Sequence, residues 1–315
     1  MKILITGASG FIGSTLAKKL EVLGHEVVGL YRYVADGRYD YYQLDRKVVC
    51  DIRDSEGINK VLSEVKPEVV YHLAAITPVS YSFIHPVEVT EVNYLGTLNV
   101  AGASVKAGSV KQFIHASTSE FYGDQEIFPI SEDAVPNPLS PYAASKVAAE
   151  LCLWFLWRTE KLPVTVLRPY NTYNRSNVKK EYFVVERAIT QALRNGHIHL
   201  YDPHPVRDFL DRDSHVNAYV RCLSNKRAVG EAINVGLGYG YTIEEMAQRV
   251  AEIVGIELGK EIKISWDMKP DRPYDIQRLI CSNSKALRLL DWKPLYTFQE
   301  GLRLAIKEWR EALGV

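Results

Sequence analysis

Residues 2–13 read KILITGASGFIG, and this stretch decides the fold class. It begins with a short, mostly apolar run that predicts a buried strand. Gly7, Gly10 and Gly13 then recur at every third residue, and an apolar helical pattern starts behind them. A second apolar run over residues 26–31 completes a strand–turn–helix–strand unit. Such a unit typically opens a parallel α/β sheet.

The glycine turn predicts a phosphate site. Glycines permit a tight turn, a close approach of the backbone to a pyrophosphate, and close packing of the helix on the strand. The pyrophosphate would rest on the helix N-terminus, where backbone N–H groups lack partners. The spacing is Gly-x-x-Gly-x-x-Gly rather than Gly-x-Gly-x-x-Gly, so the position of the turn in the first βα unit carries the prediction. We expect a dinucleotide cofactor to contact Gly7, Gly10, Phe11, Ile12 and Gly13.

The end of the second predicted strand should carry the residue that reads the adenosine ribose. The sequence there is Leu-Tyr-Arg at 30–32, and the first acidic residue after it is Asp36. An arginine at this place accommodates a 2′-phosphate, so Arg32 favours NADP over NAD. The alternative is an arginine that only faces water at the end of a strand.

Two further predicted strands, residues 47–50 and 68–73, should end at the same edge of the sheet. Asp51 follows the first and could reach the adenine amino group, while Asp54 is placed to cap the next helix. Small residues follow the second strand and let the backbone lie against the cofactor. The residues expected at the cofactor on these grounds are Asp51, Ile52, Leu73, Ala74 and Ala75. Asn93, within a helix predicted over 86–107, is either a buried structural hydrogen bonder or part of the site.

A tyrosine and a lysine supply a candidate proton relay. Residues 115–123 read HASTSEFYG and residues 140–146 read SPYAASK. Pro141 favours a helix start, so Tyr142 and Lys146 should share one helical face. A phenol has a pKa of about 10, and a cation one turn away favours the phenolate. This pair suits the alcohol/carbonyl redox step of a nicotinamide-dependent enzyme, whereas an amphipathic helix with a solvated lysine is the plainer interpretation.

The composition bounds the class of protein. The chain has 315 residues with 38 Lys+Arg and 38 Asp+Glu, which does not suggest a nucleic-acid or polybasic membrane partner. The four cysteines are scattered, so we expect neither a disulfide framework nor a metal site. The N-terminal apolar run is too short for a signal peptide core, and we expect a cytoplasmic protein.

The βα alternation stops near Asn171, which suggests two domains. We expect a Rossmann-type doubly wound parallel sheet over residues 1–170, and a smaller mixed α/β substrate domain over 171–315, with some segments returning to the first domain. Residues 151–157 read LCLWFLW. This aromatic-apolar stripe is either core or a subunit interface, and it underlies our expectation of a homodimer or homotetramer.

Three motifs together resemble the extended short-chain dehydrogenase/reductases that act on nucleotide sugars: the glycine turn, Thr-Ser-Glu-x-Tyr-Gly at 118–123, and Tyr142-x-x-x-Lys146. The resemblance continues in Arg-Pro-Tyr-Asn at 168–171, Val-Arg-Asp-Phe at 206–209 and Arg-Pro-x-Asp at 272–275. It implies a nucleotide-diphosphate sugar as substrate, with arginines gripping the diphosphate. The substrate-binding residues implied in this way are Ser119, Asn171, Arg207 and Arg272.

Within this family, Thr-Ser-Glu at 118–120 is similar to the GDP-mannose 4,6-dehydratases, and it also resembles the UDP-glucuronate decarboxylases. The resemblance implies that Thr118 fixes the sugar 4-oxygen, while Tyr142 removes the 4-hydroxyl proton and hydride passes to the nicotinamide. Lys146 would lower the tyrosine pKa and bind the cofactor ribose. Glu120 would then remove the C5 proton, the 6-hydroxyl would leave as water, and hydride would return to C6.

Two other functions remain open. A 4-epimerase would use Thr118, Tyr142 and Lys146 in the same way, but would let the ketone turn over and accept hydride on its other face. Glu120 would then be only a structural carboxylate. The dTDP-glucose dehydratases carry an aspartate where Ser119 stands, so in a dehydratase the proton donor to the leaving hydroxyl stays open. A non-catalytic, cofactor-sensing regulator is a remote alternative, because such proteins usually lack the tyrosine or the lysine.

Overall fold

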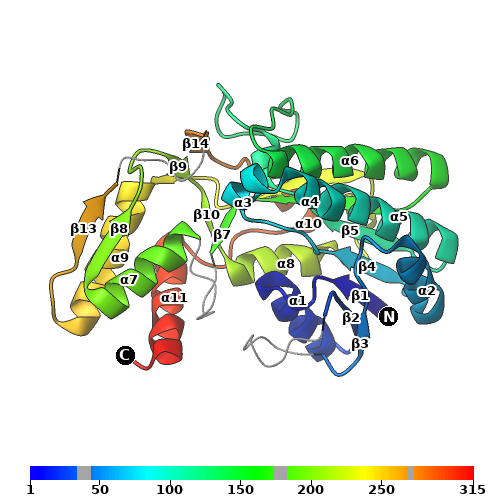
Figure 1. Cartoon of the computed structure of the whole chain (residues 1–315), viewed down its shortest axis with the longest axis horizontal. Coiled ribbons are helices and arrows are strands. Elements are labelled where there is room, and N and C mark those ends of the chain that lie inside the picture. Colours follow the sequence, from blue (N-terminus) through cyan, green and yellow to red (C-terminus); the bar gives the residue numbers. More distant parts are fainter. Residues whose placement is uncertain (34–43, 174–182, 268–272) are drawn as a thin grey trace.

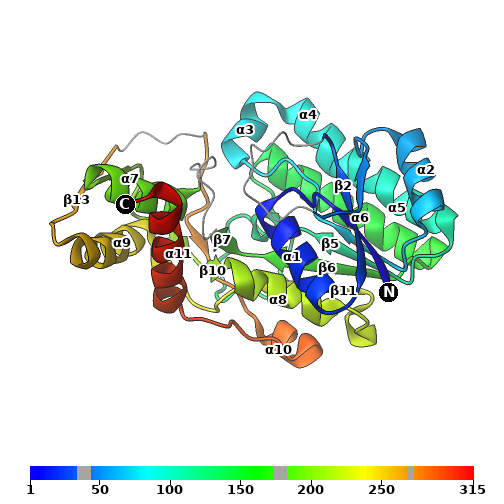
Figure 2. The same ribbon diagram turned by 90° about the horizontal axis from the view of Figure 1, so that it is seen from below.

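The structure is a computed structural model of the chain, and it describes residues 1–33, 44–173, 183–267 and 273–315. A large parallel sheet with helices on both faces occupies one side of the molecule, and a smaller lobe of helices and short strands lies beside it (Figures 1 and 2). Within the described ranges, no helix is long and apolar enough to cross a membrane.

Seven parallel strands form the main sheet of the described chain, in the order β11–β6–β5–β4–β1–β2–β3. This is the predicted Rossmann-type, doubly wound α/β fold. From β1 the chain adds β2 and β3 on one side, and it then returns to add β4, β5 and β6 on the other side of β1. Ligands of such sheets bind at the carboxyl ends of the strands beside this switch point. The strands are β1 Lys2–Thr6, β2 Glu26–Tyr31, β3 Lys47–Val49, β4 Val69–His72, β5 Gln112–Ala116, β6 Val164–Pro169 and β11 Glu231–Val235.

Helices cover both faces of this sheet (Figure 1). On one face α1 (Phe11–Val22) packs against α8 (Arg212–Cys222). On the other face α5 (Gly96–Ala107) packs between α2 (Ser55–Val65) and α6 (Pro141–Glu160). Because β11 and α8 come from the second half of the chain, that half contributes to the large sheet and to its cover.

The helix predicted over 86–107 is interrupted by a π-helical turn. It consists of α4 (Pro86–Thr90), the π turn Glu91–Leu95 and α5, and it is preceded by a short helix, α3 (Val79–Ile84), which the sequence pattern did not predict. Asn93 lies buried in the π turn. A π turn is a rare feature that often marks a functional region.

The side chain of Asn93 holds the loop after β4 in place. Its Oδ1 accepts a hydrogen bond from the N–H of Ile76 at 2.8 Å, and its Nδ2 donates to the carbonyl of Ile76 at 3.0 Å. The same Nδ2 donates to Ser145 Oγ on α6 at 3.1 Å. Asn93 is therefore a buried structural hydrogen bonder, which decides between the two interpretations of this residue.

In its described part, the smaller lobe combines three helices with two pairs of short strands and one group of three. The helices are α7 (Val184–Asn195), α9 (Ile243–Leu258) and α11 (Phe298–Leu313), and α10 (Ser284–Leu290) packs against β11. The short strands are β7 Asn171–Tyr173 with β10 Phe209–Asp211, β8 His197–Leu200 with β13 Lys263–Trp266, and β9 Val206–Arg207 with β12 Tyr241–Thr242 and β14 Arg278–Leu279.

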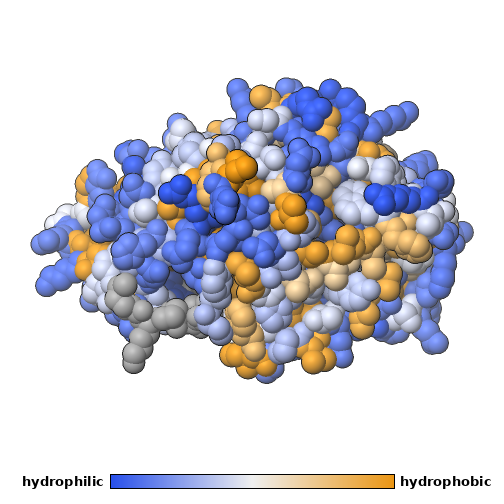
Figure 3. Space-filling model, turned by 90° about the horizontal axis from the view of Figure 1, so that it is seen from above, coloured by the Kyte–Doolittle hydropathy of each residue, from blue (hydrophilic) through white to orange (hydrophobic). Residues whose placement is uncertain are grey.

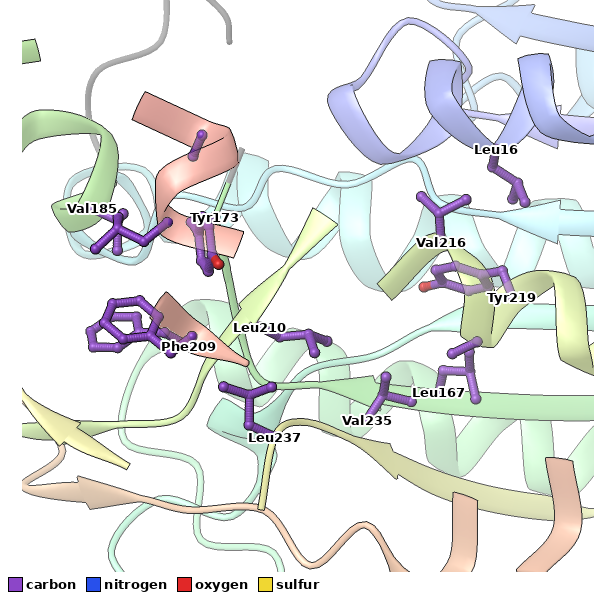
Figure 4. Packing of buried hydrophobic residues seen from close by; sticks show 14 of the residues in the cluster. Leu16, Leu167, Tyr173, Val185, Phe209, Leu210, Val216, Tyr219, Val235 and Leu237 are labelled. Atoms are coloured by element: carbon purple, nitrogen blue, oxygen red, sulfur yellow. The ribbon is translucent and has the colours of Figure 1, made fainter. Parts of the chain in front are cut away.

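One apolar core runs through both parts of the molecule. Figure 4 shows Tyr219 and Val216 of α8 packed near Leu16 of α1 and Leu167 of β6, while Tyr173, Val185 and Phe209 gather farther along the same core. This continuous core places the start of the smaller lobe against the carboxyl edge of the sheet.

Candidate active site

Two adjoining cavities lie at the carboxyl edge of the main sheet. The first, of about 290 Å³, is lined by the glycine turn and by the residues that follow β2, β3 and β4. Every residue expected at the cofactor on these strands and this turn lines it: Gly7, Gly10, Phe11, Ile12, Gly13, Arg32, Asp51, Ile52, Leu73, Ala74 and Ala75. We refer to it as the cofactor cavity.

The glycine turn approaches the end of β4 too closely to admit side chains. Gly7 has a φ of +72°, and a Cβ atom there would lie 2.8 Å from the N atom of Ala74. A Cβ on Gly13 would collide with the carbonyl oxygen of Gly7. Both positions therefore require glycine, and the bare backbone at the start of α1 forms a cradle that fits a pyrophosphate.

Asp51, which lines the cofactor cavity with Arg32, is paired with two arginines. Arg32 Nε lies 3.2 Å from Asp51 Oδ2, and Arg53 Nη2 lies 2.7 Å from the same oxygen. The hydrogen bond from Arg53 holds the pKa of Asp51 below its ordinary value. Asp54 caps α2 by accepting from the N–H of Gly57 at 3.0 Å, as its position suggested. Asp36 lies outside the described residues.

The second cavity, of about 250 Å³, contains the candidate proton relay. Ser140 caps α6 by accepting from the N–H of Ala143 at 3.1 Å, and Pro141 is the first helical residue, as predicted. Tyr142 and Lys146 are buried on the helical face that lines this cavity. Burial lowers the pKa of Lys146 to about 8, while the carboxylate of Glu150 opposes that shift. We refer to this space as the catalytic cavity.

The turn after β5 brings the remaining candidate catalytic residues to the same place. Thr118 precedes a 3₁₀ turn, Ser119–Phe121, and its Oγ1 accepts a hydrogen bond from the N–H of Glu120 at 3.2 Å. Thr118, Ser119 and Glu120 all line the catalytic cavity together with Tyr142 and Lys146. The structure thus assembles the predicted set from two elements that are separate in sequence.

A buried ion pair behind these residues was not predicted. Arg168 Nη2 donates to Glu150 Oε2 at 2.7 Å, and Arg168 Nε donates to Glu150 Oε1 at 3.0 Å. Ser117 Oγ also donates to Glu150 Oε1. Arg168 Nη1 donates to the hydroxyl of Tyr122 at 2.8 Å, which donates onward to Asn234 Oδ1 at 2.6 Å. Burial alone would lower the pKa of Arg168, but Glu150 raises it above its ordinary value.

A helical spacing in the sequence could have revealed this ion pair. Glu150 follows Lys146 by one helical turn, so its carboxylate lies on the inward face of α6. Arg168 is the last residue but one of a strand that is otherwise apolar apart from one threonine, and a charge buried there needs a partner.

The predicted substrate residues separate into three cases. Ser119 and Asn171 line the catalytic cavity. Arg207 is buried on β9, donates to the carbonyl of Val206 at 3.0 Å and pairs with Asp275, and it lines neither of the two cavities. Arg272 lies outside the described residues.

Several other residues that line the catalytic cavity were not predicted from the sequence. They come from the start of α7, from β7 and from α8, and they are Phe183, Val184, Val185, Glu186, Thr172, Tyr173, His215 and Tyr219. Their elements carry no recognisable motif at these positions. In the parts of the chain that the structure describes, no three His, Cys, Asp or Glu side chains are grouped as metal ligands would be.

Comparison with known sequences shows close relationships over almost the whole chain. A model of the GDP-mannose 4,6 dehydratase family matches residues 4–305. The UDP-glucose 4-epimerase of Mycolicibacterium smegmatis is 33% identical over 98% of this chain and 99% of its own length. The dTDP-D-glucose 4,6-dehydratase of Mus musculus is 29% identical over 98% of this chain and 89% of its own length. Enzymes named for epimerisation and for dehydration are thus similar to this chain to nearly the same degree.

Solved structures show the same relationship. The UDP-glucose 4-epimerase of Thermotoga maritima, solved with UDP-glucose, superimposes with a TM-score of 0.89 at 32% identity and covers 99% of this chain and 100% of its own. The UDP-glucose 4-epimerase of Thermus thermophilus, solved with NAD, gives a TM-score of 0.85 at 32% identity, again covering 99% of this chain and 100% of its own.

Proposed function

The chain belongs to the GDP-mannose 4,6 dehydratase family of the extended short-chain dehydrogenase/reductases, and we propose that it is a nucleotide-sugar 4,6-dehydratase. The curated relatives are named for the epimerisation, reduction, dehydration or decarboxylation of nucleotide sugars, which supports a nucleotide-sugar enzyme here. The observation that supports dehydration is the position of Glu120, a half-buried carboxylate that lines one cavity with Thr118, Tyr142 and Lys146.

A nicotinamide dinucleotide fits the cofactor cavity. The side-chain-free cradle at Gly7 and Gly13 suits a pyrophosphate, and the cavity joins the catalytic one through shared lining residues that include Phe11 and Ile12. The Thermus thermophilus relative is a complex with NAD. When bound there, the nicotinamide would supply a two-electron acceptor and donor next to Tyr142.

In this proposal Tyr142 removes the proton from the sugar 4-hydroxyl. The ammonium of Lys146, one turn away, favours the phenolate of Tyr142. Thr118 Oγ1 accepts from the N–H of Glu120, so its own hydroxyl proton is available to the sugar 4-oxygen. Oxidation of C4 to a ketone makes the hydrogen on C5 acidic.

Glu120 is then the general base at C5. A carboxylate next to an acidified C–H can accept its proton, and loss of the 6-hydroxyl gives a C5–C6 double bond and water. The leaving hydroxyl needs one proton, and Ser119 offers no carboxyl group. We assign that proton to Glu120, which carries it after the first step, so one side chain serves both steps. Hydride addition at C6, with a new proton taken from solvent at C5, then yields a 4-keto-6-deoxy sugar.

Product analysis tests this proposal. The enzyme would be incubated with NAD or NADP and with GDP-mannose, UDP-glucose or dTDP-glucose, and the products weighed by mass spectrometry. A product lighter by one water supports dehydration. Glu120→Gln should lose this product by a factor of about 100 or more, because a general base typically contributes about 10²–10⁴-fold. Formation of the product at the wild-type rate by Glu120→Gln would refute the role of Glu120.

A 4-epimerase is the second candidate, supported by the UDP-glucose 4-epimerases that are 32–33% identical and match along nearly the full chain. Epimerisation needs only Thr118, Tyr142 and Lys146. It would give a product of unchanged mass with an inverted C4, and Glu120→Gln would retain most of the activity.

Arg32 underlies our proposal that NADP is the preferred cofactor. It lines the cofactor cavity where β2 ends, and its guanidinium is half exposed. A 2′-phosphate would accept hydrogen bonds from this group. The ion pair with Asp51 leaves NAD as the alternative, because Asp51 partly neutralises the arginine.

We also propose that two copies of the chain associate through α6. The side chains of the apolar stripe at 151–157 lie on two sides of α6. Leu153 and Leu156 are buried in the core, while Leu151 and Phe155 are 63% and 59% exposed. Figure 3 looks onto this side of the molecule and shows apolar residues gathered over part of it. The exposed apolar residues of α6 and of the adjacent helical turns, which form the proposed interface, are Ile84, Val87, Leu95, Leu151 and Phe155. Contiguous exposed apolar patches usually mark an interaction surface.

A further inference from the structure

Several polar side chains that line the catalytic cavity have a buried atom without a hydrogen-bond partner among the residues that the structure describes. They include Asn171 Oδ1, His215 Nε2 and the hydroxyl of Tyr219. A buried polar atom without a partner is costly, and native structures contain few of them. A cavity wall that carries several such atoms is the pattern expected where a bound ligand completes the hydrogen bonding.

The neighbours of His215 assign the tautomer of its ring. Thr172 Oγ1 lies 3.1 Å from the carbonyl oxygen of Tyr170 and 2.9 Å from His215 Nδ1. A carbonyl can only accept, so Thr172 satisfies it by donating its one hydroxyl proton. Both contacts are hydrogen bonds only if Nδ1 of His215 carries a proton and donates it to Thr172. In the neutral ring this leaves Nε2 as an acceptor with a free lone pair.

The surroundings keep this ring neutral and fixed. Burial lowers the pKa of His215 to about 3, so the imidazole is uncharged at physiological pH. The ring stacks on Tyr219, with centroids 5.2 Å apart and planes 28° apart. Both residues lie on α8, which packs against the helix that begins at the glycine turn. The lone pair of Nε2 is therefore held in one orientation.

From this we propose that His215 is a ligand-reading residue whose Nε2 accepts a hydrogen bond from an N–H or O–H group bound in the catalytic cavity. A neutral imidazole acceptor cannot bind phosphate or carboxylate oxygens, which are themselves acceptors. The inference rests on the proposed function, whose two ligands both carry such a donor: the carboxamide of the nicotinamide and the hydroxyls of the sugar.

Nitrogen NMR tests the tautomer without any enzyme activity. Protein labelled with ¹⁵N-histidine is compared with His215→Gln to assign the signal among the eight histidines. We expect a protonated Nδ1, an unprotonated Nε2 and no titration between pH 5 and 8, because burial lowers the pKa of His215 to about 3. A protonated Nε2, or a titration near the ordinary histidine pKa of about 6.5, would overturn the proposal.

Ligand titrations identify the donor. NADH or NADPH, and in a separate sample UDP-glucose or GDP-mannose with oxidised cofactor present, are added to the labelled protein. A shift of the Nε2 signal with the reduced cofactor assigns the carboxamide, and a shift only with the nucleotide sugar assigns a hydroxyl. If the protein binds cofactor but converts no sugar, the proposed dehydratase function fails while the cofactor titration still tests His215. Binding of both ligands without any shift at Nε2 overturns the inference.

Paired variants separate ligand reading from packing. His215→Gln keeps an acceptor oxygen near the place of Nε2, whereas His215→Leu keeps only the bulk. We expect His215→Leu either to lower the affinity for the cofactor, measured by fluorescence, or to raise the KM for the sugar. The expected change is about tenfold, which is the effect on affinity of losing one hydrogen bond. His215→Gln should restore most of this loss, at a similar melting temperature. Equal losses in both variants, or none in either, would contradict the proposal.

Discussion

The Nζ atom of Lys146 donates a hydrogen bond to the carbonyl oxygen of Ala116 across 2.8 Å. One turn farther along α6, Glu150 accepts a hydrogen bond from the side chain of Ser117, the next residue of the chain. The helix therefore holds the end of β5 at two successive residues, and Thr118 follows directly. This attachment fixes Thr118 relative to Tyr142, because Tyr142 lies one turn before Lys146 on the same helix.

The ion pair of Glu150 with Arg168 should contribute strongly to stability. Glu150→Gln leaves the buried guanidinium without its charge partner, and breaking such a pair typically costs about 3–5 kcal/mol. The free energy of unfolding, measured by urea titration, should fall by that order. The double variant Glu150→Leu/Arg168→Met removes both charges and should recover much of the loss. A single variant as stable as wild type would contradict this account.

The pH dependence of activity should report on Lys146. Its pKa is lowered to about 8, chiefly by burial, while Glu150 raises it. The ammonium is present below that pH and is lost above it, so kcat/KM should decline above about pH 8 as support for the Tyr142 phenolate disappears. In Glu150→Gln the raising influence is gone, and the alkaline limb should move to lower pH. An alkaline limb that stays in place or moves upward would exclude this role for the carboxylate.

Arg32 should control the choice of cofactor. Arg32→Ala removes the guanidinium that we pair with the 2′-phosphate, so the affinity for NADPH should fall about tenfold or more while that for NADH changes little. Fluorescence titration measures both. Arg46→Ala is a matched control, because Arg46 is also exposed and ion-paired, but to Glu26 and away from the cofactor cavity. Equal losses for the two cofactors would remove Arg32 from cofactor selection.

Association through α6 should depend on Phe155. Phe155→Lys places a charge in the centre of the exposed apolar stripe, and the mass in solution should fall to that of one chain. Light scattering after gel filtration measures it. Val22→Lys, which alters another exposed apolar residue, on α1, should leave the mass unchanged. Retention of the wild-type mass by Phe155→Lys would place the interface elsewhere or show that the chain is a monomer.

Local signals made the sheet and the two motif-bearing turns predictable. The strands predicted at 26–31, 47–50 and 68–73 are confirmed to within a residue, because apolar runs between glycines and helices can be recognised in short stretches of sequence. The glycine turn was predictable for a similar reason, since the left-handed φ of Gly7 and the close approach of Gly13 to the Gly7 carbonyl both lie within the turn. The proline and tyrosine at the start of α6 likewise indicated the helix face that lines the cavity.

Features that depend on distant partners were not predictable. The π turn contains Asn93, which binds the backbone of Ile76, a contact between residues too far apart in sequence for a local pattern to show. The partnership of Glu150 with Arg168 joins a helix to a strand only after the sheet has formed. His215 on α8 is part of no motif, and its tautomer is set by Thr172 on β7.

The composition of the product made in heavy water tests the central claim most directly. In the proposed dehydratase the C5 proton passes through Glu120 to the departing water, so C5 takes its new proton from solvent. Mass spectrometry of the reaction in D₂O should therefore show a nucleotide sugar that has lost one water and gained solvent deuterium at C5, and Glu120→Gln should form almost none of it. A product that keeps the mass of the substrate and carries an inverted C4, formed equally by wild type and Glu120→Gln, would contradict the account and identify a 4-epimerase.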